Sequence, residues 1–189
     1  MPATVPLPAS PARTPPAVVR VDLDEPVHRR ELLRVLESYA RDPMGMEREL
    51  EPGEGERILD GLREHPTSFV ILALIDGEGA GAVVCFTAFS TFQAKPFLTV
   101  LDLTVRRRHR RKGLARLLLR ACEEEARRLG CGKLTLEVRE DNQGALALYR
   151  ELGFGDPVLG RQPQRTLVLE KPLATDNRPT NQRPPEELA

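Results

Sequence analysis

The stretch that most constrains this chain runs from Leu98 to Ala115. An apolar segment, LTVLDLTV, is followed by the basic run RRRHRRK and then by Gly-Leu-Ala, where a helical pattern begins. This order predicts a buried strand, a basic turn and a glycine that opens a helix. The first backbone N–H groups of a helix have no intrahelical partners and lie at the positive end of its dipole. The segment therefore predicts an anion site flanked by cationic side chains.

Charge is balanced over the whole chain, which has 28 Lys and Arg against 28 Asp and Glu in 189 residues. The basic run is therefore a local feature, and general binding of polyanions is disfavoured. Only 4% of the residues are aromatic and none accompany the run, so we expect no nucleic-acid partner. The run taken alone is also compatible with a solvated basic turn at a helix start.

Cysteine usage and hydropathy indicate the compartment. Cys85, Cys122 and Cys131 stand in apolar or helical patterns, with no CxxC motif and no clustered histidines. This arrangement predicts free thiols and no metal site. The longest apolar run, residues 69–75, is too short to cross a bilayer, and the N-terminus does not resemble a signal peptide. We expect a cytoplasmic protein with no membrane partner.

Hydrophobic periodicity divides the chain into alternating strands and helices. We expect strands at residues 18–23, 68–75, 81–91, 98–105, 133–139 and 165–173, with a short one near Val158. Helices are expected at residues 24–42, with Asp24 as N-cap, and at 54–65, 113–129 and 142–152, the last capped by Asn142. This order predicts an α/β sheet with helices on its faces.

Composition also predicts the domain limits. Residues 1–17 are rich in proline and alanine, and residues 174–189 are polar and contain prolines. Neither segment has the apolar content needed to offset the entropy of ordering, so we expect both to be disordered. A single domain is then expected over residues 18–173.

Two motifs follow one another around the predicted anion site. Residues 110–115 have the form R-x-x-G-x-A, in which glycine allows close backbone approach and alanine leaves room beside it. A strand and a helix later come Leu136-Glu137-Val138-Arg139, Asn142, Ala145, Leu148-Tyr149 and Leu152-Gly153-Phe154. Residues 98–156 thereby resemble the acetyl-CoA-binding half of the GNAT superfamily of N-acetyltransferases. The N-terminal half is similar only in the order of its elements, and Arg107 stands where many members have proline.

The resemblance implies a fold and a co-substrate. The fold would be α/β, a mixed, mostly antiparallel sheet with a splayed central strand pair and helices on both faces. The co-substrate would be acetyl-CoA, with no metal required. Backbone groups of Leu103, Thr104 and Val105 would bind its pantetheine and thioester, and Asn142 and Ala145 would also line the cofactor site. The pyrophosphate would be held by Arg110, Arg111, Lys112, Gly113, Leu114 and Ala115.

The same resemblance places Tyr149 beside the sulfur of the cofactor. A tyrosine of pKa ~10 can protonate a leaving thiolate whose thiol has a pKa of ~8.5, so Tyr149 is the expected general acid. Its alternative is a core tyrosine packed against Phe154. For the base that takes a proton from the amine, Glu137 is the first candidate and Asp102 the second. A solvated edge charge and a carboxylate bound to backbone groups are the respective alternatives.

The expected reaction is direct attack of a primary amine on acetyl-CoA in a ternary complex, because no cysteine is paired with a histidine as a nucleophile. Residues 39–49 and 89–92 are candidates for the walls of the acceptor site. We expect a small-molecule amine as acceptor. Alternatives are a protein N-terminal acetyltransferase, which the spacing of Glu137 and Tyr149 resembles, and a non-catalytic acyl-CoA sensor. A homodimer is compatible with the sequence.

Overall fold

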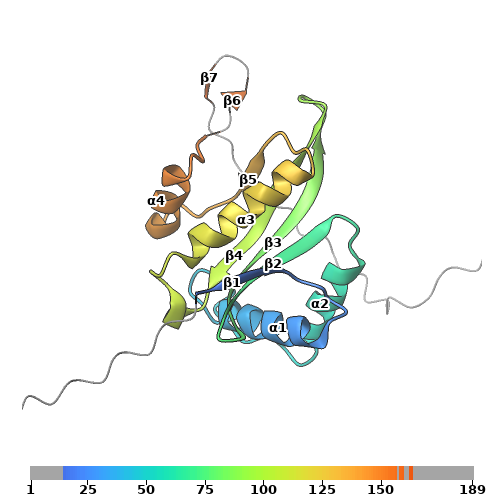
Figure 1. Cartoon of the computed structure of the whole chain (residues 1–189). Coiled ribbons are helices and arrows are strands. Elements are labelled where there is room, and N and C mark those ends of the chain that lie inside the picture. Colours follow the sequence, from blue (N-terminus) through green and yellow to red (C-terminus); the bar gives the residue numbers. More distant parts are fainter. Residues whose placement is uncertain (1–14, 157, 160–161, 164–189) are drawn as a thin grey trace, which may run out of the picture. The chain divides into compact units, whose positions relative to one another are not determined.

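A computed structural model of the chain describes residues 15–156, 158–159 and 162–163, and its elements follow the expected order (Figure 1). The strands are β1 (Ala17–Arg20), β2 (Ser68–Ile75), β3 (Glu78–Ser90), β4 (Lys95–Val105), β5 (Leu134–Leu136), β6 (Val158–Leu159) and β7 (Gln162–Pro163). The helices are α1 (Pro26–Ala40), α2 (Glu54–Glu64), α3 (Leu114–Arg128) and α4 (Gln143–Glu151), with a 3-10 turn, η1 (Arg107–His109). The expected strand at 165–173, the tail 174–189 and most of segment 1–17 lie outside the described residues.

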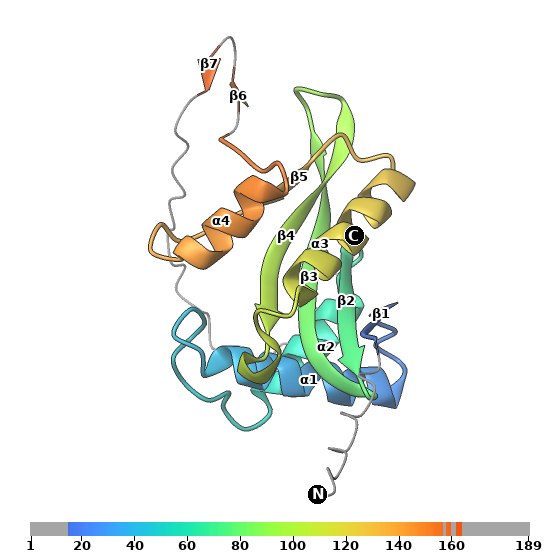
Figure 2. The ribbon, with the colours of Figure 1, turned by 60° about the vertical axis from the view of Figure 1, so that its left-hand side comes forward.

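Five strands form one sheet in the order β1-β2-β3-β4-β5, and β6 and β7 form a separate antiparallel pair. Neighbouring strands from β1 to β4 are antiparallel, and β5 joins β4 in parallel. The last register pair of β4 and β5 is Val100 with Leu136, whereas β4 continues to Val105 (Figure 2). The mixed, mostly antiparallel sheet with a splayed β4–β5 pair is therefore confirmed.

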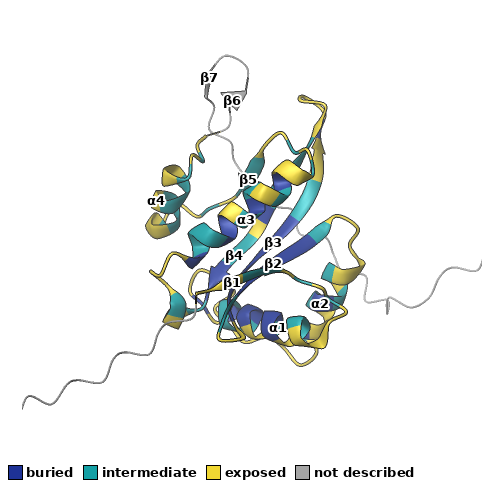
Figure 3. Ribbon diagram, in the orientation of Figure 1, coloured by how far each residue is buried: buried dark blue, intermediate teal, exposed yellow. Residues whose placement is uncertain are grey.

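Helices cover both faces of the five-stranded sheet (Figures 1 and 3). Helices α1 and α2 pack on one face, where buried side chains form a core of Leu32, Val35, Leu36, Leu59, Val70, Leu72, Ala82 and Val84. Helix α3 packs against β1 to β4 on the other face, where the Sγ atoms of Cys85 and Cys122 lie 3.6 Å apart. Val84 belongs to the core under α1 and α2, whereas Cys85 contacts α3. Each register pair of β3 and β4 can therefore be assigned to one of these two faces.

A β-bulge in β4 decides which layer Asp102 faces. Cys85 pairs with Val100 and Val84 with Asp102, so Leu101 is an extra residue without a partner in β3. Val100 accordingly faces α3, as Cys85 does, whereas Asp102 faces α1, as Val84 does. Without the extra residue, strict alternation would place Asp102 on the same face as Val100. The bulge therefore turns this carboxylate toward the first helix.

Helix α1 is fastened to the start of β3 by a buried carboxylate. Glu31 is 2% exposed. It accepts hydrogen bonds from the Gly79 N–H at 3.1 Å, from Arg30 at 3.1 Å and from Arg34 at 2.9 Å. Burial alone would raise the pKa of Glu31, but these three donors hold the pKa below its ordinary value. Gly79 leaves no room for a side chain, since a Cβ there would lie 2.6 Å from the Glu31 carbonyl oxygen.

Several element boundaries differ from the expectation, and β3 and β4 each begin three residues earlier than expected, at Glu78 and Lys95. Strand β1 spans Ala17–Arg20 instead of 18–23, and β5 ends at Leu136 instead of 139. The shorter β5 follows from the bulge, because its partner β4 diverges immediately after Val100. The N-cap of α1 is Glu25, without a side-chain cap bond, and the assignment of Asp24 was wrong. A residue before proline favours extended backbone, so Pro26 sets the start of the helix.

Candidate active site

The basic run folds into a turn that presents backbone N–H groups. After η1, Arg111 and Gly113 both adopt left-handed conformations, with φ of 61° and 81°. Helix α3 then begins without a side-chain cap, and its first intrahelical-type bond runs from the Leu117 N–H to the Gly113 oxygen at 3.1 Å. Within the described part of the chain, the N–H groups of residues 111–116 donate no hydrogen bond. Such a concave set of N–H groups at a helix start suits an anion.

Several basic side chains of this turn are already bonded to the protein. Arg108 pairs with Glu78, and Lys112 Nζ donates to the Arg108 carbonyl oxygen at 2.8 Å. Arg110 donates from Nε to the Val105 oxygen at 2.9 Å and from Nη2 to Asp42, and its own N–H donates to the Arg107 oxygen at 3.3 Å. Anion binding here therefore depends first on the backbone of residues 111–116.

The open edge of β4 leads directly into this turn. Leu103, Thr104 and Val105 lie beyond the last β4–β5 register pair, so no strand covers the β5 side of their backbone among the described residues. An unpaired strand edge offers N–H and C=O groups to an extended ligand. The site residues predicted in β4 and in the turn thus form one continuous stretch from Leu103 to Ala115.

Two side chains from separate elements interact at the start of that stretch, and a third influences one of them. The Asp102 carboxylate, in β4, interacts with the hydroxyl of Tyr39, in the last turn of α1. Ionisation of Tyr149, in α4, would raise the pKa of Tyr39 further, so the two phenols lie within electrostatic reach of each other. Of the predicted catalytic residues, Asp102 therefore contacts Tyr39, and Tyr149 is related to it only through its electrostatic influence on Tyr39.

Burial perturbs all three groups in the same direction. It raises the pKa of Asp102, although the hydrogen bond with Tyr39 partly opposes the shift. Burial also raises the pKa of Tyr149. The pKa of Tyr39 is raised by burial and then by the adjacent Asp102 carboxylate. At neutral pH both phenols consequently keep their protons, while a carboxylate with a raised pKa becomes a better proton acceptor.

Glu137 occupies a different environment from Asp102. It lies one residue beyond the end of β5 and is exposed. Sequence reasoning placed it on the polar face of a strand, and that strand stops at Leu136. The structure thus leaves Glu137, the first-ranked candidate for the base, exposed, whereas Asp102, the second-ranked candidate, is half-buried.

Helix α4 contains residues of the second motif and is linked to the start of α3, where the first motif ends. Asn142 caps it as expected, and its side-chain oxygen accepts from the Ala145 N–H at 3.2 Å. This bond commits the Asn142 oxygen to the helix and leaves its NH2 group as the donor for a ligand. Near the other end of α4, Glu151 pairs with Arg116 in the first turn of α3 at 2.6 Å. The ion pair links α4 to the helix that opens the anion site.

The expected acceptor walls are only partly acidic. Asp42 is 8% exposed and paired with Arg110, and Glu49 lies 3.5 Å from Arg41. Neither carboxylate is therefore an uncompensated negative charge. The sequence indicated Tyr39 as an apolar position of the first helix and as one end of this wall, and gave it no role beside Asp102. Its contact with Asp102 depends on the β4 bulge, for which the residues carry no evident signal.

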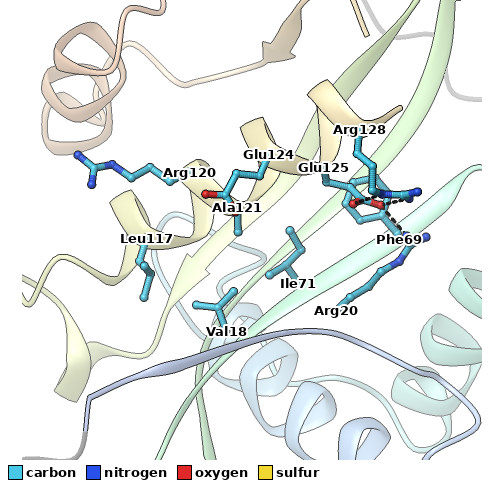
Figure 4. Close-up of a pocket in the computed structure, with 10 residues that line it drawn as sticks. All are labelled: Val18, Arg20, Phe69, Ile71, Leu117, Arg120, Ala121, Glu124, Glu125 and Arg128. Carbon is cyan, nitrogen blue, oxygen red and sulfur yellow. Dashed lines mark hydrogen bonds and ion pairs between the residues drawn. The ribbon is translucent and has the colours of Figure 1, made fainter. Parts of the chain in front are cut away.

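Other features of the fold lie away from these residues. A surface groove of about 610 Å³ runs between β1–β2 and α3, and Arg20, Glu125 and Arg128 form ion pairs over it (Figure 4). None of its lining residues belongs to the predicted site. Among the described residues there is no cluster suited to hold a metal ion and no helix long and apolar enough to cross a membrane.

The geometry joins a set of N–H groups at a helix start that donate no hydrogen bond within the described residues, an open strand edge and the interacting side chains of Asp102 and Tyr39. The sequence profile of the Acetyltransferase (GNAT) family matches residues 32–154, which include all three. The chain belongs to the GNAT family. This places the first two helices in the same family domain as the cofactor half, although only the latter carried recognisable motifs.

Individual relatives of this GNAT chain match shorter stretches. It is 37% identical over 101 residues to a streptothricin acetyltransferase of Streptomyces lavendulae, covering 53% of this chain and 51% of that protein. It is 38% identical over 63 residues to the ribosomal protein bS18-alanine N-acetyltransferase of Escherichia coli K12, covering 33% of this chain and 43% of that protein. The chain thus spans about half the length, or less, of these two curated relatives.

Among solved structures, a ribosomal-protein-alanine N-acetyltransferase from Brucella melitensis biovar Abortus 2308 superposes with a TM-score of 0.65. The match covers 80% of this chain and 100% of that one at 18% identity. At this identity the likeness supports the GNAT fold and carries no information about the substrate.

Proposed function

We propose that this GNAT protein transfers the acetyl group of acetyl-CoA to a primary amine by direct attack in a ternary complex. The observation that carries the proposal is the interaction of Asp102 with Tyr39, immediately before the open edge of β4 at residues 103–105. Pantetheine would extend along residues 103–105, and the pyrophosphate would bind the N–H groups of residues 111–116. Residues 18–173 would form the catalytic domain.

The reaction needs one base and one acid. An alkylamine of pKa ~10.4 is mostly protonated at pH 7, so its proton must leave before the nitrogen can attack. We assign this proton to Asp102, directly or through water, since burial has raised the pKa of that carboxylate. As the C–N bond forms, the C–S bond breaks, and Tyr149 donates its proton to the departing thiolate. The attacking nitrogen gives up its second proton as the amide forms, and this proton returns Tyr149 to its neutral form through water. No covalent acetyl-enzyme is formed.

The cysteines support this direct route. Cys85 and Cys122 are buried against each other between β3 and α3. The Cys122 contact and burial both raise the pKa of Cys85, which keeps it a thiol. A thiol is a poor nucleophile compared with a thiolate. Neither residue is therefore suited to carry an acetyl group.

A small-molecule amine is the proposed acceptor. The relative matched over the longer stretch is named for streptothricin, which supports this class. Asp102 interacts with a tyrosine, whereas Asp42 and Glu49 have arginine partners. This distribution suits an acceptor that brings a single amine to Asp102. A protein α-amino group is the second candidate, favoured by the relative named for a ribosomal-protein alanine.

An acceptor screen tests the proposed function. The full chain is incubated with acetyl-CoA and with monoamines, polyamines, streptothricin or peptides that begin with alanine, and release of free thiol is followed. We expect release well above background hydrolysis with at least one monoamine or small-molecule amine. Stimulation by peptides alone would establish the second candidate. Binding of acetyl-CoA without stimulation by any amine would contradict an acetyltransferase and indicate a sensor.

A further inference from the structure

The Arg110 side chain bridges the proposed cofactor site and the loop between α1 and α2, residues 41–53. Resting on the proposed function, we propose that Arg110 and Asp42 form a positioning pair that transmits pyrophosphate binding to this loop. Cofactor binding would thereby order one wall of the acceptor site before the amine arrives. Arg110 would act through Asp42 and would not contact the phosphates through its side chain.

The first step of the argument is the placement of the guanidinium. Its Nε donates to the carbonyl oxygen of Val105, the last residue of β4, at 2.9 Å. Its Nη2 donates to Asp42 Oδ2 at 2.5 Å. The residue itself stands immediately before the N–H groups of residues 111–116. A ligand that fixes this turn therefore also fixes the position from which the guanidinium reaches the loop.

The second step is the cost of moving Arg110 away. Asp42 is 8% exposed, and its other oxygen accepts from the Met44 N–H at 3.1 Å. Burial alone would raise the pKa of Asp42, but the Met44 N–H and the Arg110 guanidinium hold the pKa below its ordinary value. If Arg110 turned to a phosphate, a buried carboxylate would lose its cation, which is strongly unfavourable. The pair should therefore persist when the cofactor binds.

The third step connects Asp42 to the rest of the loop. The Gly45 N–H donates to the Asp42 oxygen at 2.8 Å, and the Arg48 N–H donates to the Ala40 oxygen at 3.1 Å. At Gly45 the loop comes so close to α1 that a Cβ would lie 2.1 Å from the Tyr39 carbonyl oxygen. These contacts join the loop, through Asp42 and Gly45, to the end of α1 that carries Tyr39.

Two ligands that favour the same arrangement of a loop bind cooperatively, and such coupling commonly changes affinity by about 5- to 150-fold. Cofactor binding should therefore slow amide exchange throughout residues 41–53, and not only in residues next to the pyrophosphate. Removing the pair should abolish that effect and raise the KM for the amine about fivefold or more, with little change in affinity for CoA.

Hydrogen exchange of the full chain with and without CoA tests the proposal. Variants Asp42→Asn and Arg110→Gln, and the double variant, are compared with the wild type, and calorimetry gives the Kd for CoA of each. Asp42→Asn retains an oxygen that can accept from Met44. The matched control is Glu78→Gln. Glu78 lies on β3 and pairs with Arg108, two residues before Arg110, so this variant removes the acidic partner of another arginine of the turn without touching the loop. We expect CoA to protect residues 41–53 in the wild type and control only, with the double variant resembling either single variant.

Equal protection in all proteins that bind CoA would overturn the pairing. A large loss of CoA affinity in Arg110→Gln, with the CoA affinity of Asp42→Asn unchanged, would also overturn it. The lost protection of the loop would then follow from weaker binding of CoA. That result would show a direct contact between Arg110 and phosphate. If the wild type does not bind CoA at all, the proposed function itself fails, and this outcome is distinct from both others.

Discussion

At the scale of single residues, one unpaired residue in a strand decides the environment of a carboxylate. Leu101 has no partner in β3, and Asp102 is thereby turned toward α1 and Tyr39. Bulges near active sites commonly redirect a side chain in this way. The proposed base thus depends on the backbone of β4 as much as on its own chemistry.

Substitution of Asp102 by Asn should change the pH dependence of the reaction. The carboxylate accepts a proton only when ionised, so wild-type kcat/KM should fall with decreasing pH through an apparent pKa above the ~3.9 of an ordinary aspartate. The Asn variant should lose about 10²-fold or more at neutral pH. Rate profiles from pH 5 to 9 measure both effects. Glu137→Gln serves as comparison, and a larger loss in that variant would restore Glu137 as the base.

Replacement of Tyr149 by Phe removes one hydroxyl and keeps the ring. Turnover should fall about 10²-fold or more, because the thiolate would leave without a proton donor, whereas acetyl-CoA affinity should remain within a few-fold. Stopped-time thiol assays and calorimetry supply the two quantities. Unchanged turnover would remove Tyr149 from the acid role, and an equal loss of affinity would indicate a binding role instead.

The residues of the site differ in how far sequence alone could identify them. Tyr149 and Gly113 stand in motifs that resemble a known family, so their positions could be expected. The contact of Tyr39 with Asp102 could not, because it joins residues far apart through a change of strand register. The ranking of Glu137 above Asp102 rested on spacing, which contains no information on burial.

At the scale of elements, α1 and the β2–β3 turn are joined by a buried acid. Glu31 satisfies the Gly79 N–H and is neutralised by Arg30 and Arg34. Removal of the carboxylate leaves a buried N–H without a partner, which typically costs roughly 1–3 kcal/mol. This contact holds the helix whose last turn carries Tyr39.

Glu31→Ala should therefore lower the free energy of unfolding by roughly 2 kcal/mol in urea denaturation at pH 7. The pKa of Glu31 is held below its ordinary value, so its stabilisation is present above about pH 4.3 and is lost as the pH falls further. Glu56→Ala breaks an exposed pair with Arg29 and should cost less than about 1 kcal/mol. Equal effects of the two substitutions would contradict the anchoring role.

Element order followed from periodicity, and β2 was predicted with its observed limits. Two of the missed boundaries have different causes. Strand β5 stops because β4 bulges away from it, and α1 starts at Pro26 because proline restricts the preceding residue. The second of these was readable from local chemistry, whereas the first required the register of a distant pair of strands.

At the scale of the whole molecule, the family domain combines a part with recognisable motifs and a part without them. Residues 98–156 carry the resemblance, whereas the profile of the family extends back to residue 32. Helix α1 and the loop after it supply Tyr39 and Asp42, which meet β4 and the anion turn. The proposed amine site therefore lies where the less recognisable part contacts the other, and its specificity is the least predictable property.

Calorimetric titration with acetyl-CoA tests the central proposal, that the N–H groups at the start of α3 hold the cofactor. Gly113 and Gly130 occupy the two ends of α3 with φ of 81° and 69°, and neither has an atom within 4 Å of an added Cβ. Valine is strained at both positions but alters the turn only at Gly113.

We expect one-to-one binding by the wild type and by Gly130→Val, and about tenfold or weaker binding by Gly113→Val, since each hydrogen bond to a charged group contributes roughly 1.5–3 kcal/mol. No binding by the wild type, or equal affinity in Gly113→Val, would contradict a cofactor site at this turn.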